Sequence, residues 1–396
     1  MLKKVLYITY DGLTDPLGQS QIIPYLKGIS QKYHVTVLSF EKSTPMPTIF
    51  QETKLDLKKN KISWIPLRYV KQVPLISKPW GISQGILKLM LSSSSYDVII
   101  CRSYIAAIIG CVICKLKKIK FVFDMRGFWP EERVDGALWS KNGIYFKLFK
   151  CIEKFLLKNT DCVIVLTKNA QKFLMSNMPY LNTSKIKIIP TCVDTQLFRS
   201  KLKTKNTMSF CYSGSIGTWY GLYEMLSFFS CVQKYYPTAT LDFLINHTAM
   251  QNLSSDILTL ISSQKNIQIQ TVSYKMLPNY LEKYTFGLFF YKRPLSKAGC
   301  CPTKLGEYFA MGIPVITNRG TGDCDEWIET NHLGILIDDF SKSAYERGSA
   351  QIPSILNDVD IREKCRKFST TYLDLYKVGI PTYQNIIQQT TKQNVL

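Results

Sequence analysis

Short hydrophobic runs alternate with longer amphipathic stretches along the first half of the chain. The runs are rich in β-branched residues, which is typical of strands buried on both faces, and apolar residues recur at helical spacing in the stretches between them. This alternation predicts a parallel sheet with helices on both faces. The predicted strands are residues 5–10, 35–40, 97–101, 120–124 and 161–166, and the predicted helices include residues 19–32 and 144–158.

The pattern breaks at a polar, basic stretch, residues 199–207, and then begins again. A stretch of this composition between two alternating patterns is typical of a linker. We therefore expect α/β architecture with two Rossmann-like, doubly wound domains, residues 1–198 and 208–371. In the second half the predicted strands are residues 209–213, 240–245, 267–270, 286–291, 314–317 and 334–337, the predicted helices are residues 222–235 and 303–311, and a helical tail covers 361–388.

The net charge of +21 is distributed unevenly along the 396 residues. Residues 1–206 contain 33 Lys and Arg against 13 Asp and Glu, whereas residues 207–396 contain 17 against 16. A basic excess confined to one half indicates an anionic partner for that half, such as a membrane surface, an acidic substrate or nucleic acid. Helix-turn-helix, RNA-binding and zinc-finger signatures are lacking, so we expect no nucleic-acid partner.

The 12 cysteines are scattered, and most lie within apolar runs. Only Cys111 and Cys114 form a C-x-x-C pair, and the chain has three histidines, so we expect buried thiols in a reducing cytosol and no metal site. The hydrophobic run after Met1 is too short for a secretory signal, and no run approaches the ~18 apolar residues that span a bilayer. These features predict a cytoplasmic protein.

Polar residues follow several predicted strands of the first half. They include Asp124 and Arg126 after one strand and Arg102 after another, with Trp129 and Trp139 nearby. The carboxyl ends of parallel strands meet at one edge of the sheet, where ligands of doubly wound folds bind. We expect these charges to converge there, although capping, surface pairing and ordinary aromatic packing would explain each of them singly.

Two segments of the second half have the chemistry of a phosphate site. Residues 214–221 place glycines between a strand and a helix, where backbone N–H groups and the helix dipole favour an anion. Residues 300–317 predict a helix with Pro302 at its start, and Glu307 shares one helix face with Thr303. Arg293, Lys297 and Lys304 are candidate phosphate-binding cations, or otherwise a solvated basic loop.

Taken together, these segments resemble the group 1 (family 4) retaining glycosyltransferases, which have the GT-B fold. The resemblance covers most of the chain. It is carried by residues 10–21, 101–104, 123–129, 189–194, 212–220 and 302–314.

The resemblance implies that the second domain holds a nucleotide-sugar donor. Glu307 would bind the donor ribose, and Gly18 would approach the diphosphate from the first domain. The acceptor would enter near Arg102, and a terminal helix, residues 372–396, would cross back to the first domain. The other donor-binding residues would be Gly214, Ser215 and Thr218 at the diphosphate and Cys301, Pro302, Thr303 and Leu305 facing the sugar and diphosphate.

Three positions depart from the family pattern. Gly299 stands where the first Glu of the E-x7-E motif is expected, Tyr220 where a Lys is expected, and Ser215 or Ile216 where an Arg is expected. Arg293, Lys297 or Lys304 would replace the missing diphosphate cations.

We therefore expect a retaining transferase that moves a sugar, with UDP as the preferred nucleotide, to a lipid-linked or polysaccharide acceptor of surface glycan. Asp124, Arg126 and Lys304 are the expected catalytic residues, and no cofactor or obligatory metal is expected. One alternative is a non-hydrolysing nucleotide-sugar 2-epimerase, which would need additional carboxylates and histidines. The other is a non-enzymatic protein that binds polyanions.

Residues 69–90 mix Lys with Trp, Ile, Leu and Met, as segments that lie at a membrane interface do. Packing on the first sheet is the alternative explanation of this pattern. With the basic excess of the first half, the segment predicts peripheral docking to an anionic membrane surface at its inner face.

Overall fold

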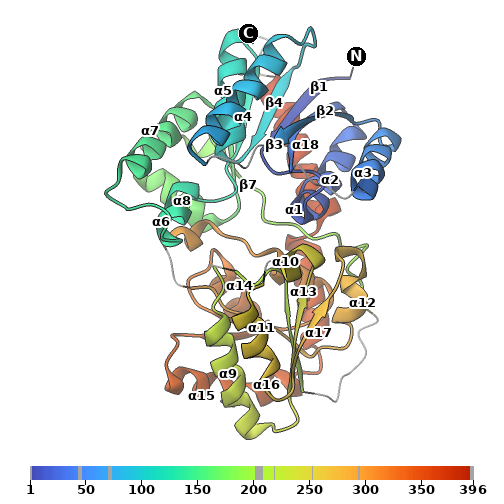
Figure 1. Ribbon diagram of the computed structural model, residues 1–396, viewed down its shortest axis with the longest axis vertical. Helices are drawn as coiled ribbons and strands as arrows, with labels where there is room; N and C mark the ends of the chain where they lie inside the picture. The colour runs from blue at the N-terminus through green and yellow to red at the C-terminus, as the bar shows by residue number, and fades with distance from the viewer. Residues whose placement is uncertain are drawn as a thin grey trace. The chain divides into compact units, whose positions relative to one another are not determined.

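The computed structural model of the protein describes residues 2–42, 47–69, 74–200, 208–217, 219–251, 253–292 and 295–392. Contacts within the chain divide it into two units (Figure 1): an N-terminal unit, Met1–Pro190 with Leu375–Leu396, and a C-terminal unit, Thr191–Asp374. This division falls at Pro190 and Asp374, whereas the sequence suggested 198 and 371. Most of the expected linker, residues 201–207, lies outside the described residues.

The N-terminal unit is built on a seven-stranded parallel sheet with the order β3-β2-β1-β4-β5-β6-β7. The strand order reverses between β1 and β4, so the carboxyl ends of these two strands flank a switch point. The strands are β1 Lys4–Thr9, β2 His34–Lys42, β3 Ser63–Tyr69, β4 Val98–Arg102, β5 Lys120–Asp124, β6 Cys162–Val165 and β7 Ile186–Ile188.

Helices cover both faces of this sheet. The apolar helix α5 (Ser103–Lys117) is mostly buried and ends at Lys118, which has a left-handed conformation (φ 52°). The other helices are α1 Pro16–Gln21, α2 Ile23–Ser30, α3 Pro47–Lys59, α4 Pro74–Met90, α6 Trp129–Asp135, α7 Ile144–Asn159, α8 Lys168–Asn177 and the 3-10 helix Thr183–Lys185.

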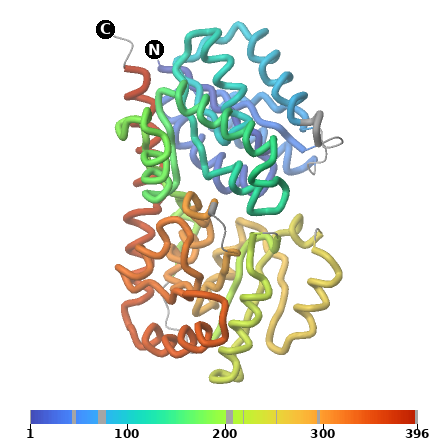
Figure 2. Tube along the Cα trace, turned by 90° about the vertical axis from the view of Figure 1, so that its left-hand side faces the viewer, coloured from blue at the N-terminus to red at the C-terminus, as the bar shows by residue number. Residues whose placement is uncertain are grey.

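The end of the chain returns to this unit as a π-helix, Leu375–Gly379, followed by α18 (Ile380–Lys392). A Cβ atom at Gly28 of α2 would lie 2.2 Å from the Cδ1 atom of Ile380, so the two helices pack closely because Gly28 lacks a side chain. The amide of Gln384 donates to the backbone carbonyl of Gly28 over 2.9 Å. In Figure 2 the red terminal helix runs beside the N-terminal unit accordingly.

Two expectations for this unit differ from the structure. The helix expected over residues 19–32 is two helices, because Ile22 leaves the helical region (φ −120°, ψ −60°) and Pro24 cannot donate a backbone hydrogen bond. Strands β3 and β7 were not predicted. They form the two edges of the sheet, and their mixed burial gives no continuous hydrophobic run.

The C-terminal unit has a six-stranded parallel sheet with the order β10-β9-β8-β11-β12-β13, and its switch point lies between β8 and β11. Its core is rich in aromatic rings, among them Phe210, Phe228 and Tyr308. The strands are β8 Ser209–Ser213, β9 Thr240–Ile245, β10 Ile267–Thr271, β11 Phe286–Phe289, β12 Val315–Asn318 and β13 Gly334–Ile337.

The helices of this unit follow the strands as expected of a doubly wound fold. They are α9 Leu222–Tyr235, α10 His247–Gln251, α11 Ser255–Ser262, α12 Leu277–Leu281, α13 Thr303–Ala310, α14 Cys324–Asn331, α15 Lys342–Ala350, α16 Ile352–Asn357, α17 Ile361–Tyr372 and the 3-10 helices Tyr274–Met276 and Leu295–Gly299. Strand β11 ends at Phe289, two residues before the predicted end. The tail that the hydrophobic pattern predicted as helical is interrupted between Tyr372 and Leu375.

Candidate active site

The glycine loop of the C-terminal unit begins at the carboxyl end of β8. Gly214 has φ 118°, a conformation that L side chains rarely adopt, and its N–H donates to the carbonyl of Leu244 over 3.0 Å. A Cβ atom at Gly214 would lie 3.5 Å from the Nζ atom of Lys304. The first turn of α13 therefore meets the glycine loop at the switch point.

Lys304 has a buried side-chain amine beside the glycine loop. The residue is 5% exposed, and its Nζ atom has no hydrogen-bond partner among the residues that the structure describes. Nζ lies 3.8 Å from the ring centroids of both Tyr212 and Tyr220, whose π-faces attract it. Burial lowers the pKa of Lys304 well below its usual value, and the neighbouring Glu307 opposes this effect.

Glu307 lies one turn further along α13, on the same face as Lys304, and is likewise almost fully buried. Burial raises the pKa of its carboxyl to about 7, while Lys304 acts in the opposite direction. The carboxyl is therefore divided between its neutral and charged forms near neutral pH, and small changes in its surroundings decide which form dominates.

A second cation lies next to this pair. The Nζ atom of Lys297 is 4.8 Å from the ring centroid of Trp219 and 5.1 Å from that of Tyr291. The rings of Tyr291 and Tyr220 are themselves 4.9 Å apart. Lys297 and Lys304 are thus linked through packed aromatic rings.

The remaining expected donor-binding residues lie around α13 and the glycine loop. Cys301 is buried, and its Sγ atom accepts the backbone N–H of Thr191 over 3.3 Å. Pro302 caps α13, Thr303 begins it, and Leu305 is fully buried on it. Ser215 is exposed, and its carbonyl accepts the hydroxyl of Tyr212 over 2.6 Å. Thr218 and Arg293 lie outside the described residues.

In the N-terminal unit, charged side chains converge at the switch point as expected. Asp124 ends β5 and is fully buried, and Arg102 ends β4 and is 4% exposed. A guanidinium nitrogen of Arg102 lies 3.8 Å from Asp124, and another lies 3.7 Å from Asp11. Arg126, with φ 60°, turns back so that its Nη1 atom is 3.9 Å from Oδ1 of Asp124.

This cluster is completed by two tyrosines. Tyr383 of α18 donates its hydroxyl to Oδ2 of Asp124. Burial raises the pKa of Tyr7, beside Arg102, to about 12, so that its hydroxyl stays neutral. Oδ1 of Asp124 and Nη1 of Arg126 face each other at 3.9 Å, and neither makes a hydrogen bond to a described residue. Buried polar atoms normally have hydrogen-bond partners, so both atoms have hydrogen-bonding capacity left for a bound molecule.

The loop after β1 is held by a buried carboxylate that sequence reasoning missed. Glu41, at the end of β2, accepts the N–H groups of Leu13 (2.8 Å) and Thr14 (3.1 Å) and the hydroxyls of Thr14 and Ser39 (2.6 Å each). A Cβ atom at Gly18 would lie 2.2 Å from the carbonyl oxygen of Gly12, so this loop closes tightly only with glycine there.

Glu41 directly follows a predicted strand, so the rule that found Asp124 and Arg126 also pointed to Glu41. Tyr383 had no such signal, because it lies in a helix more than 250 residues from Asp124 along the chain. The aromatic rings around Lys304 and Lys297 likewise lie in separate segments of the sequence. Hydrophobic spacing identifies such rings as core residues and does not indicate a cation between them.

Residues 27–197 match the family model "Glycosyltransferase Family 4", and residues 249–345 match "Glucosyltransferase 3-like, C-terminal domain". No curated protein matches the sequence.

Solved structures match over almost the whole chain, at low sequence identity. HepE of Anabaena, solved with UDP and glucose, has a TM-score of 0.67 and 12% identity, over 98% of this chain and 99% of that one. Sucrose-phosphate synthase of Thermosynechococcus elongatus has a TM-score of 0.70 and 13% identity, over 98% of this chain and 100% of that one. A Listeria monocytogenes protein described as a putative UDP-N-acetylglucosamine 2-epimerase has a TM-score of 0.59 and 14% identity, over 99% of this chain and 96% of that one.

The solved structures show that the chain has the fold of the GT-B glycosyltransferases. The match of residues 27–197 to the Family 4 model supports a glycosyltransferase. The expected fold class is thus confirmed, and the comparison supports the expected transferase.

Three further findings bear on the expectations. No group of three or more potential metal ligands occurs among the described residues. No helix in the described part of the chain is long and apolar enough to cross a bilayer. An epimerase would need histidines near the site, and one of the three, His247, is exposed at the start of α10, just after β9.

Proposed function

We propose that the protein is a retaining glycosyltransferase that moves a sugar from a UDP-sugar to a hydroxyl of a lipid-linked or polysaccharide acceptor in surface glycan synthesis. The observation that carries this proposal is the buried Lys304 beside Glu307 and Gly214, whose Nζ atom makes no hydrogen bond within the described part of the chain. Burial disfavours the charged form of this amine and Glu307 is only partly charged, so the negative charge of a diphosphate would favour the charged form.

On this proposal, each donor group has a partner in the C-terminal unit. The carboxylate of Glu307 accepts hydrogen bonds from the ribose hydroxyls. The sugar and the diphosphate are faced by the backbone of residues 301–305 and of the loop that begins at Gly214. The positive end of the α13 dipole also attracts the diphosphate. Lys304 and Lys297 replace the two cations that the loop lacks.

The chemical step breaks the bond between the anomeric carbon and the diphosphate oxygen, and the leaving UDP keeps the electron pair. Fixed cations and helix dipoles stabilise the charge that develops on UDP. The acceptor hydroxyl attacks the same face, and its proton passes to an oxygen of the departing phosphate. Asp124 and Arg126 orient the acceptor through Oδ1 and Nη1, the two atoms that make no hydrogen bond among the described residues.

The basic excess of residues 1–206 supports an acceptor at a membrane surface. We propose that the enzyme works in the cytoplasm, docked at the inner face of the membrane, on a lipid-linked acceptor, with no obligatory metal. Residues 69–90 were the expected docking segment, and residues 70–73 of it lie outside the described residues. Trp80 and Leu87 of α4 are exposed, whereas Gly81 and Gly85 pack against Tyr10 and Ile109.

A thermal-shift panel of UDP, GDP, ADP, dTDP and CMP tests the proposal. UDP at 100 times its dissociation constant should stabilise the protein by about 2.7 kcal/mol, and the variant Glu307→Ala should lose most of this stabilisation. If no nucleotide raised the melting temperature, the donor assignment would be wrong.

Epimerisation remains the second candidate, because a protein described as an epimerase shares this fold. Incubating the enzyme with UDP-sugar alone separates the two activities. An epimerised donor would support the epimerase. A donor that stays unchanged until an acceptor is added supports the transferase.

A further inference from the structure

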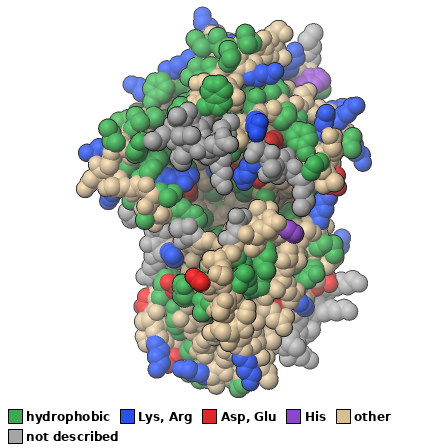
Figure 3. Space-filling model, viewed as in Figure 1, with side chains coloured by type: hydrophobic (Ala, Val, Ile, Leu, Met, Phe, Trp, Pro, Cys, Tyr) green, Lys and Arg blue, Asp and Glu red, His purple; other side chains and the backbone are tan. Residues whose placement is uncertain are grey.

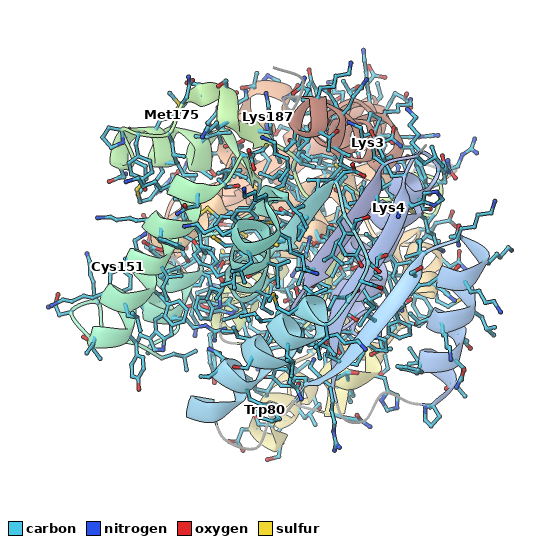
Figure 4. The ribbon with its side chains drawn as sticks, turned by 90° about the horizontal axis from the view of Figure 1, so that it is seen from above. Lys3, Lys4, Trp80, Cys151, Met175 and Lys187 are labelled. Carbon is cyan, nitrogen blue, oxygen red and sulfur yellow. The ribbon has the colours of Figure 1, made fainter. Side chains whose placement is uncertain are left out.

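Helix α7 (Ile144–Asn159) presents apolar side chains to solvent along one stripe. Ile144, Leu148, Cys151 and Phe155 are three or four residues apart and therefore share a face. Ile144 is 76% exposed, and Leu148 and Phe155 are each 51% exposed. Figure 4 shows Cys151 at the outer edge of the N-terminal unit, pointing away from its sheet. Helices of water-soluble proteins usually turn such a stripe inward.

The charges beside this stripe are all of one sign. Lys147, Lys154 and Lys158 are exposed on α7. The one acidic residue of the helix, Glu153, is buried and bonded to Tyr104 and Lys150. The exposed face of α7 therefore combines apolar side chains with a row of lysines and no carboxylate.

The surface continues onto the neighbouring helix α5. The Nζ atom of Lys115 lies 4.4 Å from the ring centroid of Phe155, and the adjacent Leu116 is 61% exposed. Lys117 donates to the carbonyls of Leu89 and Ser92, which joins the end of α5 to the end of α4. In Figure 3 hydrophobic and basic side chains lie together over the part of the N-terminal unit where Figure 1 shows α7.

We infer that this face, the exposed stripe of α7 with Leu116 and the lysines beside it, is the surface that docks on an anionic lipid bilayer. The inference rests on the proposed membrane association and makes it more specific. It places the contact on α7, whereas the sequence suggested residues 69–90. A bilayer suits this combination, because apolar side chains insert into the acyl region and lysines bind the anionic headgroups.

A second copy of the chain suits this face less well. A two-fold interface brings the same patch of both copies together. Here that would oppose lysine to lysine with no carboxylate between them, and like charges across an interface disfavour association.

Vesicle co-sedimentation tests the inference. The full chain is mixed with vesicles of phosphatidylglycerol and phosphatidylcholine, or of phosphatidylcholine alone. We expect binding to the anionic vesicles that weakens at high salt. The triple variant Lys147→Gln, Lys154→Gln, Lys158→Gln should bind about 100-fold more weakly, since each lysine near an anionic leaflet contributes about fivefold. The variant Ile144→Ser, Leu148→Ser, Phe155→Ser should lose about tenfold or more.

Helix α3 of the same unit provides matched controls. Lys54→Gln, Lys58→Gln, Lys59→Gln removes the same charge from exposed positions, and Leu55→Ser removes a leucine that is 66% exposed. Neither should alter vesicle binding by more than about twofold. Stabilisation by UDP, measured on every variant, should not change. This measurement reports on the donor site independently of the membrane. If UDP did not stabilise even the unaltered protein, the proposed function would be contradicted, while the vesicle result would still test the docking surface.

Three results would overturn the inference: equal binding to both kinds of vesicle, no binding to either, or equal losses in the α3 controls. A concentration-dependent dimer in analytical ultracentrifugation that the serine variant abolishes would also overturn it, because a second copy would then be the occupant of this face.

Discussion

Replacing Lys304 by methionine should stabilise the protein without ligand and at the same time weaken its binding of nucleotide. Lys304 is buried, and its Nζ atom makes no hydrogen bond to any residue that the structure describes. Desolvating a cation costs several kcal/mol, and the two ring contacts at 3.8 Å return about 2 kcal/mol each. Methionine fills a similar volume and packs well against Tyr212 and Tyr220.

We therefore expect Lys304→Met to raise the stability of the ligand-free protein by about 1–2 kcal/mol. For a unit of this size that corresponds to a rise in Tm of about 3–6 °C. Glu307 loses its cation, but its pKa is already about 7, so it can take up a proton at little cost.

Differential scanning fluorimetry with and without UDP measures both effects in one experiment. Without Lys304, the shift caused by UDP should fall to near zero. Lys342→Met is the control, since that side chain is 78% exposed and its loss should change neither value appreciably. A lower Tm together with an unchanged UDP shift would refute the reasoning, because Lys304 would then stabilise the fold and not the ligand.

Three further changes should have defined effects. The affinity for a UDP-sugar should rise about tenfold from pH 6 to pH 8 in calorimetry. Because the pKa of Glu307 is raised to about 7, its carboxyl is protonated below that pH and is then a poor hydrogen-bond acceptor. Glu307→Gln should remove this pH dependence. Tyr383→Phe should destabilise the N-terminal unit by about 1–3 kcal/mol in urea unfolding, since buried Asp124 loses a donor. Glu41→Ala should cost about 2–4 kcal/mol in the same assay by leaving the N–H groups of Leu13 and Thr14 without an acceptor, whereas exposed Glu52→Ala should be neutral.

The sequence predicted most strands because a parallel sheet buries both faces of its central strands, which then appear as continuous hydrophobic runs. Strands β3 and β7 were not predicted because edge strands are buried only in part, and Pro66 weakens the signal of β3 further. The interruption of the helix at Ile22 was not predicted for a different reason. Hydrophobic spacing continues across it, and only Pro24 marks the start of a new helix.

The candidate site was predictable as far as strand ends define it. Asp124 and Arg102 converge because β4 and β5 are neighbours with the same direction. What could not be predicted is the set of partners that the fold brings in from elsewhere. Tyr383 reaches Asp124 from α18, and no local pattern links the two. The pKa of Glu307 likewise depends on burial, which spacing along one helix does not reveal.

The departures of the glycine loop from the family pattern can be explained by the packing around Lys304. The resemblance expects a lysine at position 220, and this chain has a tyrosine there. The ring of Tyr220 lies 3.8 Å from the Nζ atom of Lys304, so a cation is present beside position 220 although the loop does not supply it. A lysine held by α13 between two rings has fewer conformations than one on a glycine loop, so less entropy is lost when an anion binds. On the proposed function, the loop would then lack its cations without leaving the diphosphate site uncharged, and donor binding should depend most on Lys304.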